Sequence, residues 1–194
     1  MGQTAKRSEI DGLAGQVAMA EAVATGLGYD SGLVSLVLED DPQPVEDLLY
    51  AMPAGASDRA AASFNPQAQK RTNIRSASAH LHAHAPAPVD SIRLPAGAPF
   101  GAVRVDTEGC TLCLSCVSSC PTGALTDNPD KPQLGFQESA CIQCGLCKST
   151  CPEKVITLEP RFNFAADAVE RHVVYEEEPF ECVSCGNHGT GWVR

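Results

Sequence analysis

Eight cysteines in two similar strings are the residues of this chain best suited to chemistry. Each string has the spacing Cys-x2-Cys-x2-Cys-x3-Cys-Pro, and the second repeats the first at an offset of 31 residues, from Cys110 to Cys141. The flanking segments repeat as well, so an internal duplication of one supersecondary unit explains the pattern best. Cysteine thiolates at such density indicate either a disulfide scaffold or a metal centre.

The spacing predicts two cubane clusters that share the two strings. Three cysteines separated by two residues each can wrap one face of a cubane, with backbone N–H groups directed at the sulfurs. The fourth comes about one helical turn later, and in a duplicated unit it reaches the other cluster. We therefore predict two 4Fe-4S clusters. Cluster I is assigned Cys110, Cys113, Cys116 and Cys151, and cluster II is assigned Cys141, Cys144, Cys147 and Cys120.

Two other readings of the eight cysteines are weaker. Zinc sites usually draw their four ligands from Cys-x2-Cys pairs that lie far apart in the sequence. A disulfide framework suits a secreted chain, and no apolar run follows the basic residues near the N-terminus as a secretory signal requires. We therefore expect a cytoplasmic protein with reduced, metal-binding thiols.

The last two cysteines form a separate pair near the end of the sequence. Cys182 and Cys185, followed by Gly186, have the form of a zinc knuckle. No second cysteine pair follows them, so His188 or His172 would have to complete a zinc site. A half-site without metal, or a dithiol open to oxidation, is the alternative.

Composition excludes several classes of function. The formal net charge is −10, which disfavours nucleic-acid binding because phosphate recognition needs a basic face. No run of 18 apolar residues is present, so we expect no membrane span. The sequence also lacks a complete nucleotide-binding glycine motif and a nucleophile–base set. These features favour an electron carrier over an enzyme.

The elements around the strings are predicted from local patterns. We expect helices over 13–27, 42–52 and 67–84, and a buried strand over 32–38. Helix, strand and helix in about fifty residues are too few to close a sheet, so this region is either part of an α/β domain or a helical cap. The predicted organisation is a partial α/β or helical region over 1–52, a linker with one helix over 53–99, a dicluster domain over 100–160 and an acidic extension over 161–194.

Residues 100–160 resemble the bacterial two-cluster 4Fe-4S ferredoxins. This resemblance implies a compact α+β fold with pseudo-twofold symmetry, in which two small hairpins pair the segments around each string. Residues 14–185, including the Ala- and Pro-rich stretch 85–101, are also similar to the C-terminal half of proteobacterial polyferredoxin-like proteins associated with formate dehydrogenase. That similarity implies electron supply to formate dehydrogenase or a related molybdoenzyme.

One-electron transfer at low potential, roughly −400 mV, is the leading hypothesis for function. It requires a redox protein as partner, whose basic patches would suit the acidic surface of this chain. The alternative is a docking or maturation module that the clusters stabilise. A catalytic subunit would need a further cofactor, of which the sequence gives no sign.

Overall fold

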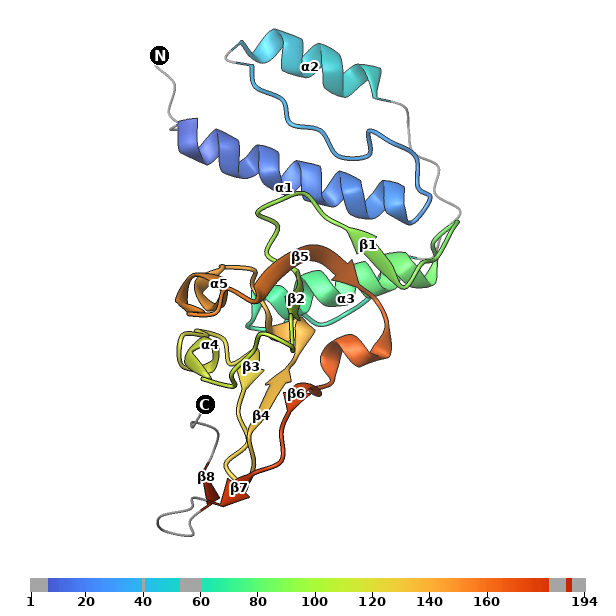
Figure 1. Cartoon of the computed structure of the whole chain (residues 1–194). Helices are drawn as coiled ribbons and strands as arrows, with labels where there is room; N and C mark the ends of the chain where they lie inside the picture. Colours follow the sequence, from blue (N-terminus) through green and yellow to red (C-terminus); the bar gives the residue numbers. More distant parts are fainter. Residues whose placement is uncertain (1–6, 40, 53–60, 182–187, 190–194) are drawn as a thin grey trace. The chain divides into compact units, whose positions relative to one another are not determined.

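The chain forms two compact units, Met1–Val89 and Asp90–Arg194 (Figure 1). This computed structural model describes residues 7–39, 41–52, 61–181 and 188–189. The boundary between the units lies inside the segment predicted as a linker. The finer divisions predicted at residues 52, 99 and 160 remain predictions.

The first unit contains helices at the three predicted places. They are α1 (Arg7–Gly26), α2 (Pro42–Ala51) and α3 (Lys70–Ala83). Beyond the end of α1, Gly28 has a φ of +81°, a left-handed conformation that glycine adopts without a steric penalty. At the start of α2, the Asp41 carboxylate accepts a hydrogen bond from the Gln43 N–H at 3.0 Å, and Pro42 occupies the first turn.

The predicted strand over 32–38 is wrong. These residues are all described and adopt no regular secondary structure. Leu33 and Leu38 are 60% and 61% exposed, so the apolar run is not buried. A strand needs a partner for its backbone groups, and no strand is found among the described residues of the first unit. That unit is therefore helical in its described part rather than α/β.

The end of α1 is joined to α3 by specific contacts. Leu27 is fully buried, and its carbonyl accepts a hydrogen bond from the Ala87 N–H at 3.0 Å. The Tyr29 hydroxyl donates to the Leu81 carbonyl at 2.7 Å. These contacts hold the two helices together inside the first unit.

The second unit combines short helices with antiparallel sheets and therefore has an α+β architecture. One sheet has the strand order β1-β5-β2 and another has the order β3-β4-β6. The elements between which the cysteines lie are β2 (Gly101–Val105), α4 (Ser115–Ser118), β3 (Leu125–Thr126), β4 (Gln133–Phe136), the 3-10 helix η1 (Glu138–Ala140), α5 (Leu146–Thr150) and β5 (Ile156–Asn163). The outer elements are β1 (Ser91–Arg93), the 3-10 helix η2 (Ala166–Val169), β6 (His172–Glu176), β7 (Phe180–Glu181) and β8 (His188–Gly189).

Strand pairing repeats at the same offset as the cysteines. Val105 of β2 faces Ile156 of β5, and 31 residues further along Phe136 of β4 faces Leu125 of β3. The helices α4 and α5 begin at equivalent positions and pack against each other (Figure 1). The two cysteine strings therefore lie in equivalent local frameworks.

The paired strands extend beyond the predicted dicluster segment on both sides. The strand β5 continues to Asn163, which gives it room to pair with β1 as well as with β2. Similarly, β6 pairs with β4. Residues 91–93 of the predicted linker and residues 172–176 of the acidic extension thus belong to the sheets around the cysteines.

Replacing Gly101 by alanine should destabilise this unit. An added Cβ would lie 2.3 Å from the Glu159 carbonyl oxygen of β5, which cannot move without breaking the strand pairing. Overpacking of this kind costs about 1–3 kcal/mol. We expect the visible absorbance of the two predicted clusters to be lost at a lower temperature in Gly101→Ala. Gly15→Ala in α1, where no atom lies within 4 Å of the added Cβ, is the control; equal behaviour of the two variants would contradict the argument.

Candidate iron–sulfur site

Left-handed residues bend both cysteine strings into tight loops. Leu112 and Leu114 have φ values of 52° and 56°, and the residues 31 positions later, Gln143 and Gly145, have values of 54° and 79°. A left-handed conformation is unfavourable for residues other than glycine and persists only where the surroundings impose it. Its recurrence at equivalent positions gives both strings the same path around their cysteines.

The first cavity brings together cysteines from both strings. Cys110, Cys113 and Cys116 of the first string line it together with Cys151 of the second. The rest of the wall is mostly apolar. It includes Val105, Leu112, Leu114, Leu134, Val155 and Ile156.

The second cavity is formed in the same way with the roles of the strings exchanged. Cys141, Cys144 and Cys147 line it together with Cys120. Other lining residues include Val103, Ala124, Leu125, Phe136, Gln143 and Leu158. The eight cysteines thus divide into the same two sets of four that the spacing predicts as ligands.

The arrangement of the thiols suits a group larger than a single ion. None of the eight forms a disulfide. In the part of the chain that the structure describes, no three Cys, His, Asp or Glu side chains converge closely enough to hold one metal ion. Four thiols spread around an apolar cavity instead match a multi-iron cluster, whose ligands are typically four cysteines.

The innermost thiols are protonated unless a positive charge is bound beside them. Burial, together with the neighbouring cysteines, raises the pKa of Cys116 to about 12 and that of Cys147 to about 11. These are the third cysteines of their strings and are 7% and 8% exposed. A thiolate at either position is costly unless a positive charge offsets it, and bound iron supplies that charge.

Cys120 lies in a more favourable environment for a thiolate. Burial acts to raise its pKa, but hydrogen bonds from the backbone N–H groups of Leu125, Thr122 and Ala124 lower the pKa below its usual value overall. Hydrogen bonds to cysteine sulfur offset negative charge in the same way when a cluster is bound.

One side of the second cavity is open to solvent. Cys144 is the only exposed cysteine among the eight described. Ile142 and Leu146, which flank it, are 37% and 46% exposed. Leu112, Leu125, Phe136 and Ile156, by contrast, are buried.

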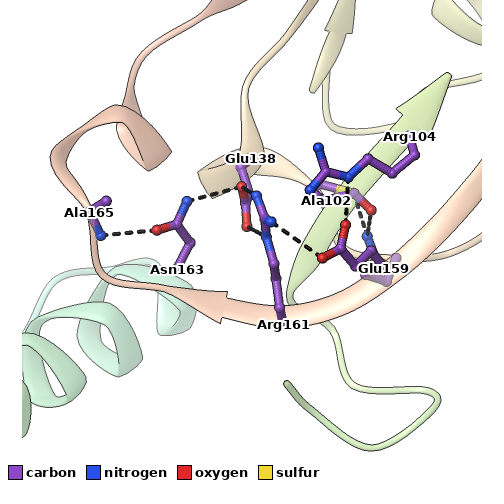
Figure 2. Close-up of polar contacts among 9 residues, drawn as sticks. Ala102, Arg104, Glu138, Glu159, Arg161, Asn163 and Ala165 are labelled. Carbon is purple, nitrogen blue, oxygen red and sulfur yellow. Dashed lines mark hydrogen bonds and ion pairs between the residues drawn. The ribbon is translucent and has the colours of Figure 1, made fainter. Parts of the chain in front are cut away.

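A buried ion pair anchors the segment before Cys141. The guanidinium of Arg161 on β5 donates to both carboxylate oxygens of Glu138, at 2.8 and 2.7 Å (Figure 2). The Asn163 amide donates to the same carboxylate at 3.1 Å. The hydrogen bonds to Glu138 raise the pKa of Arg161. Because Glu138 lies in η1, these contacts hold the start of the second string against β5.

Glu138, Arg161 and Gln143 contact one another or the second string beside the cavities, and the sequence did not single them out. Gln143 lies inside the second string, so its position alone could have drawn attention to it. Nothing in the sequence pairs Glu138 with Arg161, because the contact depends on how β5 returns past η1. Cys182 and Cys185 lie outside the described residues, and metal binding by them remains a prediction.

Family comparisons agree with this geometry. Residues 109–156 match a family described as a 4Fe-4S dicluster domain, and residues 140–187 match a second family with the same description. A search of curated proteins finds no significant match to the chain. The chain therefore carries a two-cluster, ferredoxin-like region with two 4Fe-4S clusters, the kind of centre that transfers electrons. Among the described helices, none is long and apolar enough to cross a membrane.

Removing the iron should unfold the second unit. Its core is built around the cysteine-lined cavities, and the iron–cysteine bonds that would tie the two strings together are lost with the iron. Anaerobic treatment with a ferrous chelator should abolish the strand signal in circular dichroism. A strand signal that persists after complete loss of iron would show that the unit folds without its clusters.

Proposed function

We propose that this chain is a low-potential electron carrier that passes single electrons to or from a cytoplasmic oxidoreductase. The observation that carries the proposal is the division of the eight cysteines into two sets of four around two apolar cavities. Bound there, 4Fe-4S clusters supply one-electron oxidation and reduction. Cluster I is proposed to be held by Cys110, Cys113, Cys116 and Cys151, and cluster II by Cys141, Cys144, Cys147 and Cys120.

The protein's own residues hold each cluster and limit its contact with water. The buried cysteines and the apolar walls exclude solvent on the inner side of both cavities. The matching register of β2 with β5 and of β4 with β3 supports a pseudo-twofold relation between the two halves. Negative net charge and all-cysteine ligands support a potential in the lower part of the known range.

The partner is proposed to be a redox enzyme with a basic docking face. The similarity to polyferredoxin-like proteins suggests formate dehydrogenase or a related molybdoenzyme as this partner. The choice of these enzymes rests on resemblance alone. The net charge of −10 supports only a positively charged docking surface on the partner.

Anaerobic redox titration of the purified chain tests the proposal. We expect two 4Fe-4S clusters that dithionite reduces, with interacting signals in electron paramagnetic resonance. Protein that contains only zinc would overturn the proposal. Clusters that dithionite cannot reduce would also overturn electron transfer and favour a docking or maturation role.

A further inference from the structure

The side-chain amide of Gln143 lies between β2 and the second cysteine string. Its Nε2 donates to the Ala102 carbonyl at 3.0 Å and to the Cys141 sulfur at 3.4 Å. A carbonyl oxygen only accepts hydrogen bonds, so the amide nitrogen rather than the amide oxygen must face Ala102. That contact fixes the orientation of the amide, and the second N–H on the same nitrogen is directed to the sulfur.

The structure makes room for this amide. A Cβ on Gly101 would lie 2.7 Å from the Gln143 Cδ and 2.9 Å from its Nε2. A side chain at Gly101 would therefore displace the amide. Gln143 also lines the second cavity, so its donor group lies beside the sulfur ligands proposed for cluster II.

Loop conformation does not explain the choice of glutamine. The equivalent residue in the first string is Leu112, which is buried and has nearly the same φ, 52° against 54°. In addition, the Gln143 Oε1 atom is buried with no hydrogen-bond partner among the described residues. An unsatisfied buried acceptor costs about 1–3 kcal/mol, and a leucine would avoid that cost.

We propose that Gln143 is a positioning residue that raises the reduction potential of the cluster held by Cys141, by donating an N–H to the Cys141 sulfur. The inference rests on the proposed function and its ligand sets. Reduction by one electron from a low-potential donor forms and breaks no covalent bond but adds one negative charge, which the cysteine sulfurs share. A donor to such a sulfur stabilises the reduced form more than the oxidised form.

Anaerobic redox titration of full-length Gln143→Leu with dithionite tests this inference. We expect the equilibrium constant for reduction of one cluster to become about tenfold smaller. For a one-electron step this change lowers the reduction potential of that cluster by ~59 mV. The other potential and the iron content should stay unchanged. Gln143→Met, which has a similar length but no N–H, should give the same shift if the leucine variant loses iron.

Gln137→Leu is the matched control. Gln137 is also a half-buried glutamine of the second unit, but its amide donates to the Val169 carbonyl at 2.7 Å and it lines neither cavity. Both potentials should be unchanged in this variant. Unchanged potentials in an iron-replete Gln143 variant, or equal shifts of both, would overturn the inference while leaving the proposed function intact. An unaltered protein without reducible clusters would instead overturn the proposed function and this inference with it.

Discussion

Replacing Cys116 by alanine should leave the purified protein with about half of its iron, because a 4Fe-4S cluster depends on all four cysteine ligands. Cys116 lines the first cavity and is only 7% exposed. None of the four cysteines that line the second cavity is altered by this change. The expected product is a protein with one cluster and lower stability.

Iron and sulfide analysis together with electron paramagnetic resonance measures this loss. The reduced variant should show the signal of an isolated cluster, since the interaction between two clusters disappears. Cys147→Ala, the equivalent change in the second string, should lose the other half of the iron. Ser118→Ala on the exposed side of α4 is the control and should keep full iron. Full iron in Cys116→Ala would contradict the assignment of this residue as a ligand.

Replacing Arg161 by methionine should destabilise the second unit by about 3–5 kcal/mol, because the change leaves a buried carboxylate without its cation. The Glu138 side chain is only 7% exposed and the Arg161 side chain is 20% exposed. After the substitution, the Asn163 amide remains as a donor to Glu138, but it carries no charge. Because η1 leads directly into Cys141, we expect faster loss of iron from the variant as well.

Two further variants separate this effect from a general loss of charge. Arg104 pairs with Glu159 at 2.6 Å on the surface of the same sheet, with the two side chains 63% and 41% exposed (Figure 2). Such exposed pairs contribute about 0–1 kcal/mol, so Arg104→Met should have little effect. Adding Glu138→Gln to Arg161→Met removes the uncompensated charge and should recover part of the stability. The midpoint of anaerobic denaturation, followed by cluster absorbance, compares the variants, and equal losses in Arg161→Met and Arg104→Met would contradict the account.

The cysteine sets could be predicted from the sequence because they depend mainly on the local spacing of the cysteines. Within each string, three cysteines are close neighbours and need only a tight loop to line one cavity. The exchange of the fourth cysteine followed from the duplication, and the structure gathers the same sets around its two cavities. The helices of the first unit were likewise predictable, since Gly28 and Pro42 act on the backbone within one turn.

The features that depend on distant partners were not predictable in this way. The apolar run over 32–38 has the composition of a strand, yet it lies exposed because no described strand of its unit pairs with it. Conversely, residues 91–93 and 172–176 form strands because β5 and β4 lie beside them. The pairing of Glu138 with Arg161 likewise arises only once β5 has folded back past η1.

The central claim is that the fourth cysteine of each string serves the other cluster, and paired substitutions test it most directly. Cys120→Ala with Cys141→Ala removes two residues that line the same cavity. Cys113→Ala with Cys120→Ala removes two residues of the same string that line different cavities. Both double variants contain Cys120→Ala, and they differ only in whether the other substitution lies in the second string, at Cys141, or in the first string, at Cys113.

Iron content of the two double variants, purified in parallel under anaerobic conditions, is the decisive measurement. With exchanged ligands, the Cys120/Cys141 variant loses one cluster and keeps about half of the iron, while the Cys113/Cys120 variant loses both clusters. The reverse result, with half of the iron kept in the Cys113/Cys120 variant and none in the Cys120/Cys141 variant, would show that each string holds its own cluster and would contradict the account.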